Sequence, residues 1–136
     1  MQINQVILID DDEVVNFFDK MVLSKLGLKD SEIQIYNNVA SALRYLDQVQ
    51  TNVDRNLNGI ILLDIQMPDL DGWDFLKMYE QLNQELRNHY KLIILTSDKH
   101  EYAEEKSEYH HLIHEFIHKP LTLPVFQQII DTSITH

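Results

Sequence analysis

The chain has 136 residues, the size of one ordinary domain, and contains no cysteine, which excludes disulfide bonds, zinc–thiolate sites and cysteine nucleophiles. Its 22 acidic and 11 basic residues give a formal net charge of −11, and so acidic a surface repels nucleic acids and anionic membranes. No signal-peptide pattern opens the chain, and no apolar run approaches the ~20 residues of a membrane span. We therefore expect a cytoplasmic protein with a single domain over residues 1–136 and no direct binding to DNA or membranes.

Five short apolar runs along the chain are predicted to be β-strands. Most of them are continuous runs of isoleucine, leucine and valine that stop at a polar residue. Such runs are typical of strands buried on both faces, as in a parallel sheet that helices cover on each side. The predicted strands cover residues 6–9, 33–36, 60–63, 92–95 and 113–117.

Longer segments with apolar residues at helical spacing separate these runs. In the first segment the apolar positions are Val14, Phe17, Phe18, Met21, Val22 and Leu26. Gly27 is the predicted stop of that helix, Asn38 and Thr122 are candidate N-caps of two others, and Pro124 falls in the first turn of the last helix. The other predicted helices lie within residues 39–49, 75–86, about 100–110 and 121–130.

This fivefold alternation of strand and helix predicts the fold class. A strand, a helix and a second parallel strand together make a right-handed crossover. Five strand–helix units give an α/β protein of the flavodoxin-like type: a doubly wound, open parallel sheet with helices on both faces. Ligands of such sheets bind outside the carboxyl ends of the strands.

Polar residues stand at that edge in a set that suits phosphoryl chemistry. The residues that follow the first predicted strand are Asp10, Asp11 and Asp12; Asp64 follows the third, Thr96 the fourth and Lys119 the fifth. Carboxylates that lie close together repel one another unless a cation neutralises them. Lys119 and Thr96 suit the oxygens of a phosphoryl group, and Asp64 is the best candidate to attack phosphorus and form an acyl phosphate.

Magnesium is the predicted cation of this site. Mg²⁺ prefers oxygen ligands in an octahedron and usually keeps some of its waters. Asp11 and Asp64 are expected to be direct ligands, and Asp10 a ligand directly or through water. A backbone carbonyl near Gln66 could supply a further oxygen.

These strand ends resemble those of a known family, the receiver domain of two-component response regulators. The resemblance covers essentially the whole chain and rests on residues 6–12, 61–72, 92–97 and 116–120. The second segment is the most specific, because a strand, an aspartate, then Met-Pro and Asp-Gly at this spacing is rare by chance. The chain resembles a stand-alone receiver without an output domain, which acts by protein contact, by phosphate transfer or as a phosphate sink.

The resemblance implies a role for the acidic residues. Asp64 would accept a phosphoryl group from a histidine kinase or a histidine phosphotransfer protein. Asp10, Asp11 and the backbone carbonyl of Gln66 would hold Mg²⁺. Self-phosphorylation and self-dephosphorylation are the only reactions implied, so we do not expect an enzyme that acts on other substrates.

The resemblance also implies a switch. Thr96 and Lys119 would bind the phosphoryl oxygens, with a cis bond between Lys119 and Pro120. On phosphorylation Thr96 would move toward the phosphate and Phe116 would follow it, although Phe116 lacks a tyrosine hydroxyl and a plain core aromatic is the alternative. The fourth predicted helix, the fifth strand and the last helix would report the change to a downstream protein, or form a weak dimer in a protein that is otherwise a monomer.

Two other interpretations start from the same residues. Asp10 and Asp12 have the spacing of the opening motif of haloacid-dehalogenase-type phosphatases, in which the first aspartate is the nucleophile and the second a general acid. That family places its lysine before its last acidic pair, whereas Lys119 follows every candidate acid here. A flavin-binding protein shares the architecture, but this chain has 3 glycines and no glycine-rich loop after the first strand.

A cluster of histidines and a turn after the third predicted strand are two further features of the sequence. A histidine cluster near the C-terminus consists of His110, His111, His114 and His118. Metal binding by this cluster stays open, although a solvated segment is favoured because nothing in the sequence fixes the geometry of the four rings. Asp69, Asp71 and Gly72 predict a turn with Asx-type hydrogen bonds and a flexible glycine, before a half-buried Trp73.

Overall fold

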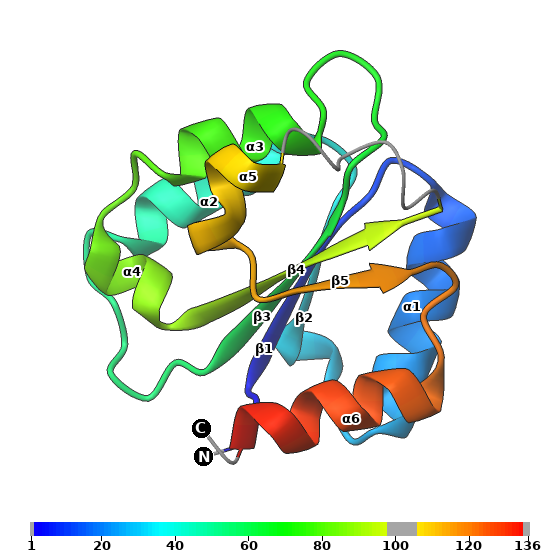
Figure 1. The fold of residues 1–136 in the computed structure, drawn as a ribbon. Coiled ribbons are helices and arrows are strands. Elements are labelled where there is room, and N and C mark those ends of the chain that lie inside the picture. The colour runs from blue at the N-terminus through cyan, green and yellow to red at the C-terminus, as the bar shows by residue number, and fades with distance from the viewer. Residues whose placement is uncertain (1, 98–105, 135–136) are drawn as a thin grey trace.

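Five parallel strands form the centre of the fold, in the spatial order β2-β1-β3-β4-β5 (Figure 1). The computed structural model describes residues 2–97 and 106–134. Every neighbouring pair of strands is parallel, so the predicted open parallel sheet is confirmed. The strands are β1 (Gln5–Ile9), β2 (Ile33–Tyr36), β3 (Gly59–Asp64), β4 (Tyr90–Thr96) and β5 (Glu115–His118).

Helices cover both faces of the sheet, as predicted. Two of them, α1 and α6, lie on one face, and the other four lie on the opposite face (Figure 1). Side chains of β1 alternate between two cores, and every residue of β3 is buried, which explains why the strands are continuous apolar runs. The helices are α1 (Glu13–Lys25), α2 (Val39–Val49), α3 (Gly72–Tyr79), α4 (Gln84–Asn88), α5 (Lys106–Tyr109) and α6 (Leu123–Ile134), with 3-10 turns at Asp30–Glu32 and His110–Leu112. None of these helices has the length and apolarity that crossing a membrane requires, within the ranges that the structure describes.

Several helices begin or end at the predicted residues. The Asn38 side chain accepts a hydrogen bond from the Ser41 amide (2.8 Å) at the start of α2. The Thr122 hydroxyl accepts one from the Val125 amide (3.4 Å) at the start of α6. Gly27 has a φ of 100°, a left-handed conformation that directs the chain away from the end of α1.

The inner face of α1 differs from the face that its apolar spacing suggests. The side chains that α1 buries are Asn16, Asp19 and Leu23. The apolar residues Val14, Phe17, Phe18 and Met21 are exposed, the first three by about 60%. The reason is position: the first turns of α1 lie beside the polar strand ends, where the Asn16 side-chain amide donates to the Asp10 backbone carbonyl (2.8 Å).

Two other predicted helices need correction. The helix expected over residues 75–86 is two helices, because α3 ends at Tyr79 and Asn83 caps the start of α4 by accepting from the Leu86 amide (2.8 Å). The apolar spacing continues across the break since both helices pack on the same core. Of the helix expected at about residues 100–110, the structure has α5 at Lys106–Tyr109, and residues 98–105 lie outside the described ranges.

Candidate functional site

The carboxyl ends of four strands bring the predicted polar residues to one edge of the sheet. The strand order reverses at β1 and β3, and Asp10 and Asp64 follow or end these two strands. Thr96 ends β4, and its backbone carbonyl accepts a hydrogen bond from the Lys119 amide beyond β5 (2.8 Å). Asp10, Asp64 and Thr96 are buried, at 4%, 6% and 2% exposure. Burying polar side chains costs stability unless they form hydrogen bonds or ion pairs, so three buried polar residues at one edge indicate a functional site.

Three carboxylates form the core of the site. One oxygen each of Asp10, Asp11 and Asp64 lie within 4.8 Å of one another, and this is the one such acidic cluster among the described residues. The Lys119 ammonium lies 3.0 Å from Asp10 Oδ2 and 3.3 Å from Asp64 Oδ1. One ammonium cannot neutralise three carboxylates, so a net negative charge remains for a cation to bind.

Backbone amides hold the carboxylates in place. The Asp12 amide donates to Asp10 Oδ1 (3.0 Å), and the Gln66 amide donates to Asp64 Oδ1 (3.2 Å). Asp64 Oδ1 therefore takes both the Gln66 amide and Lys119, whereas no hydrogen bond from the described part of the chain engages Asp64 Oδ2. A carboxylate with one oxygen held and the other open is oriented for attack on an electrophile.

The donor atoms fit a hard divalent cation. They are all oxygens, and Asp11 is exposed, so that a bound ion could keep several of its waters. Asp10, Asp11 and Asp64 are the carboxylates that could hold Mg²⁺ here. The ion would offset negative charge on the carboxylates and on any phosphoryl oxygens beside them.

The environment shifts the pKa values of two central groups. Burial, followed by the negative charge of Asp10, raises the pKa of Asp64. The positive charge of Lys119 lowers it in part, and the resulting pKa is about 6. Burial lowers the pKa of Lys119. The hydrogen bond to Asp10 and the negative charges of Asp10 and Asp64 raise it by more, so the pKa of Lys119 lies above its usual value. Lys119 is therefore a permanent cation, and Asp64 is ionised at neutral pH.

A second row of polar residues, which the apolar spacing of α1 did not reveal, lies behind the carboxylates. Asn16 Nδ2 donates to the Asp10 carbonyl, whereas Asn16 Oδ1 is buried without a hydrogen-bond partner. Burial is the largest cause that raises the pKa of Asp19, and the negative charge of Asp10 is the second. The positive charge of Lys119 lowers the pKa, and the result is a value of about 6. The signal in the sequence was their spacing, because Asn16, Asp19 and Leu23 share one face of a helix.

Replacing Asp19 by asparagine is expected to stabilise the protein at pH 7.5. The pKa of Asp19 is about 6 in the folded protein, above the ordinary value of 3.8. Below pH 3.8 the carboxyl is protonated and does not destabilise the fold, whereas its ionisation lowers the free energy of unfolding as pH rises, with the full effect reached above pH 6. We expect Asp19→Asn to raise the free energy of unfolding by about 2 kcal/mol at pH 7.5. Urea titrations at pH 4.5 and 7.5 measure the change, which should shrink at the lower pH. The exposed Glu108→Gln serves as the control, and an equal gain in both variants would contradict the assignment.

The loop after β3 is shaped by capping and by close approach. Asp71 caps α3 by accepting from the Asp74 amide (3.0 Å), and the Asp74 side chain accepts from the Asp71 amide (2.9 Å). The Gly72 amide donates to the Ile65 carbonyl (3.0 Å), which closes the loop against the strand end. A Cβ at Gly72 would lie 2.8 Å from the Asp64 carbonyl oxygen, so Gly72 is needed for space and not for the flexibility suggested above.

Replacing Gly72 by alanine is expected to disturb both stability and the carboxylate cluster. The new methyl group must push α3 away from the end of β3, because it meets backbone atoms of Asp64 and Ile65 that cannot turn aside. We expect a loss of about 2 kcal/mol in the free energy of unfolding and weaker Mg²⁺ binding by calorimetry. Gly27→Ala is the control, since its Cβ meets nothing within 4 Å and only the φ of 100° is strained. That variant should lose stability but keep the Mg²⁺ affinity of the wild type.

The remaining predicted residues lie around this cluster. Asp12 belongs to α1 and not to the cluster, because its side chain accepts from the Val14 and Val15 amides and caps the helix. The Gln66 side chain is exposed and accepts from the Ser97 hydroxyl (3.4 Å). Phe116 lies in β5, partly buried against the core that α2 and α3 cover. The Lys119–Pro120 bond is cis, as the resemblance implied.

The four histidines are not gathered into one group of metal-ligating side chains within the described residues. Their rings do not join any group of three ligands there, and two of them have other partners. His111 Nε2 pairs with Glu80 (2.7 Å), and His118 Nδ1 pairs with the Lys119 carbonyl (2.7 Å). Trp73 is half-buried in α3, as predicted, and stacks on Tyr109 with the ring centroids 6.3 Å apart.

Comparisons with known proteins agree with this geometry. The family model for the response regulator receiver domain matches residues 6–131. A two-component response regulator from Cytophaga hutchinsonii is 25% identical with a TM-score of 0.83 over 100% of both chains. A response regulator receiver protein from Dyadobacter fermentans DSM 18053 is 24% identical with a TM-score of 0.79, over 96% of this chain and 97% of the other. The receiver domain of the histidine kinase CKI1 from Arabidopsis thaliana, complexed with Mg²⁺, is 22% identical with a TM-score of 0.76, over 93% of this chain and 91% of the other. No curated protein matches the chain.

Proposed function

The chain belongs to the response regulator receiver family, and on that basis we propose that Asp64 is its phosphoacceptor. Receiver domains are signalling phosphoacceptors of two-component systems and not enzymes that act on a separate substrate. The observation that carries the assignment is the Asp64 side chain, which is buried at the end of β3 with Oδ1 held by Lys119 and the Gln66 amide and Oδ2 open. The dehalogenase-type alternative, with Asp10 as the nucleophile, has no support from the family match.

The proposed reaction transfers a phosphoryl group from a phosphohistidine to Asp64. Asp64 Oδ2 attacks phosphorus, the P–N bond of the donor breaks, and the released imidazole takes up a proton from the solvent. The product is an acyl phosphate, which a water molecule later hydrolyses back to aspartate and phosphate. Lys119 contributes a fixed positive charge 3.3 Å from Asp64 Oδ1, next to the carboxylate that attacks, and this charge would offset the negative charge of the transferred phosphoryl oxygens.

Mg²⁺ is the proposed cofactor of this reaction. Asp10, Asp11, Asp64 and the backbone carbonyl of Gln66 would hold the ion, whose charge offsets that of the phosphoryl oxygens. The oxygen-only cluster supports this, as does the Mg²⁺ complex of the CKI1 receiver domain. Thr96, buried at the end of β4, is the proposed hydrogen-bond donor to the phosphoryl group.

A switch at the far edge of the sheet is the proposed output. Thr96 would move toward the phosphate and Phe116 would follow. Phe116 pairs with Ile94, two residues before Thr96, so Thr96 and Phe116 lie on the same face of the sheet in neighbouring strands. The face formed by α5, β5 and α6 would then change its affinity for a downstream protein or for a second copy in a weak dimer. The proposed donors are histidine kinases and histidine phosphotransfer proteins, and no direct contact with DNA is proposed.

Chemical phosphorylation tests the proposed function. Incubated with phosphoramidate, whose P–N bond resembles that of phosphohistidine, and with Mg²⁺, the protein is expected to gain one phosphoryl group by intact mass. Chelating Mg²⁺ with EDTA should prevent the gain, and hydroxylamine should remove the group, as it does from acyl phosphates. A protein that gains no group under these conditions, or gains a hydroxylamine-resistant one, would contradict the proposal.

A further inference from the structure

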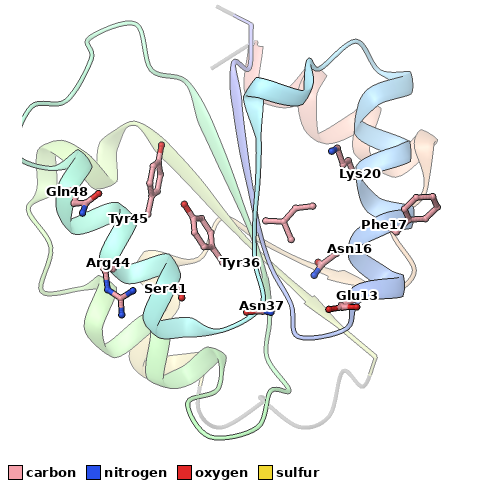
Figure 2. A pocket seen from close by; sticks show the side chains of 11 residues that line it. Glu13, Asn16, Phe17, Lys20, Tyr36, Asn37, Ser41, Arg44, Tyr45 and Gln48 are labelled. Carbon is pink, nitrogen blue, oxygen red and sulfur yellow. The ribbon is translucent and has the colours of Figure 1, made fainter.

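A groove at the opposite edge of the sheet has no part in the proposed function. It lies between α1 and α2, over the outer strand β2, and its volume is about 750 Å³ (Figure 2). In Figure 2, Glu13 and Lys20 stand on the α1 side, Arg44 and Tyr45 on the α2 side, and Tyr36 comes from β2 between them. The proposed switching face adjoins β5, which is the other outer strand of the sheet, so the two surfaces are separate.

The floor of the groove is an open strand edge. Strand β2 pairs with β1 on one side only, and the Tyr36 carbonyl points to β1, where it accepts from the Asp10 amide (3.1 Å). Successive residues of a strand direct their backbone groups to opposite edges, so the N–H and C=O of Ile35 point away from the sheet. No hydrogen bond from the described part of the chain satisfies them. An extended peptide that lies along β2 could pair with both.

The walls beside this edge are apolar and aromatic. The Ile35 side chain is 40% exposed on the α1 side of the strand. On the α2 side, the rings of Tyr36 and Tyr45 pack with centroids 5.7 Å apart. Phe17 at the rim is 61% exposed and continues the apolar surface of α1. Exposed apolar surface next to free backbone groups suits a strand with aliphatic side chains.

The charges of the groove oppose those of the rest of the chain. The formal net charge of the chain is −11, yet the groove carries Lys20 and Arg44 against one acidic residue, Glu13. Arg44 is exposed and forms no ion pair within the described residues. The nearest acidic partner of Lys20 is Asp30, at 3.9 Å between two exposed groups, which is a weak interaction. In the described part of the chain, one unpaired cation, Arg44, and one weakly paired cation, Lys20, favour a negatively charged ligand in this groove.

We propose that this groove binds a short extended segment of a partner protein, with alternating acidic and aliphatic residues, as a sixth strand along β2. Its backbone pairs with Ile35, its aliphatic side chains pack on Ile35 and Phe17, and its carboxylates meet Arg44 and Lys20. A helical ligand would leave the Ile35 backbone groups unpaired, because the backbone of a helix is satisfied internally. A second copy, paired through the same patch, would bring Arg44 and Lys20 against themselves.

Peptide selection and binding measurements test this proposal. Phage displaying random decapeptides are selected on the wild-type protein, with the Arg44→Glu variant as a competitor in solution. We expect the selected sequences to alternate aliphatic with Asp or Glu residues. The strongest one, made as a fluorescein-labelled peptide, should bind with saturable anisotropy, and Arg44→Glu should weaken binding about tenfold. Arg55→Glu, an exposed arginine outside the groove, should leave it unchanged.

Two further measurements identify the mode of binding. Methylating alternate backbone nitrogens of the peptide, in the register that faces β2, should abolish binding, while methylating the other set should not. The Ile35 amide should exchange its hydrogen more slowly in the complex, equally in the wild type and in Asp64→Ala. Selection of no peptide family, of lysine-rich peptides, or of peptides that tolerate both methylation sets would overturn the proposal. Dimerisation that Arg44→Glu abolishes in sedimentation experiments would assign the groove to a second copy instead.

Discussion

Replacing Asp64 by alanine is expected to abolish phosphorylation completely. The proposed acyl phosphate forms on Asp64 Oδ2, and no other carboxylate of the cluster is placed in the same way. Asp10 has both oxygens engaged, by the Asp12 amide and by Lys119, and Asp11 is exposed. We expect intact mass to show no gain after incubation with phosphoramidate and Mg²⁺, where the wild type gains one phosphoryl group.

The same variant is expected to remain folded. Because burial holds the pKa of Asp64 at about 6, above its ordinary value, its ionisation destabilises the protein as pH rises through 6. Removing the group should therefore leave the melting temperature at pH 7.5 equal or higher. Asp69→Asn is a matched control from the neighbouring loop, since asparagine tolerates the φ of 60° found there. A label that persists in Asp64→Asn and maps to Asp10 would assign the nucleophile to Asp10 instead.

Replacing Lys119 by methionine should slow phosphorylation by at least about a hundredfold. The ammonium is the fixed charge between Asp10 and Asp64, and methionine keeps an unbranched side chain that is one atom shorter and carries no charge. Lys119 also lowers the pKa of Asp64, so its loss should raise that pKa further and leave more of the carboxyl protonated at pH 7. The rate follows from intact mass against time, and the carboxyl titration from carbon NMR of labelled aspartate.

A comparison of variants separates this role from general stability. Lys77→Met removes an exposed lysine of α3 and should be phosphorylated at the wild-type rate. Lys119→Met should also be less stable than the wild type without Mg²⁺, because two buried carboxylates are left facing each other, and added Mg²⁺ should restore part of the loss. Phosphorylation of Lys119→Met within threefold of the wild-type rate would contradict the assigned role.

The sheet and the main site residues could be predicted because each depends on a local pattern. Strands buried on both faces must be apolar throughout, so β1, β3 and β4 are visible as continuous runs. Parallel strands place their ends at one edge, so the sequence alone predicts that Asp10, Asp64 and Lys119 lie close together. The acidic cluster is where that reasoning put it.

The missed features depend on packing between elements. The spacing of Val14, Phe17 and Phe18 predicts a helix but does not determine which face of the helix is buried. In the fold, α1 buries Asn16 and Asp19 beside the polar strand ends. The break between α3 and α4 is invisible to apolar spacing, since both sides of the break pack on one core. Asparagine at position 83 was the available signal, as an N-cap inside a predicted helix.

The need for Gly72 could not be predicted from local conformation either. A glycine after Asp71 suggests a flexible turn, whereas its actual constraint is the Asp64 carbonyl oxygen 2.8 Å from where a Cβ would lie. That distance exists only after β3 and α3 have packed together. Close approach between distant parts of a chain is a property of the assembled fold, and sequence spacing carries no record of it.

The ion pair between Lys119 and Asp10 joins residues 109 positions apart. The two residues are brought together across the strand order β1-β3-β4-β5, so the ion pair depends on the pairing of β5 with β4 and of β4 with β3. Contacts between residues so far apart in the sequence raise the contact order of a fold. The charge balance of the site therefore depends on both ends of the chain, because Asp10 follows the first strand and Lys119 follows the last.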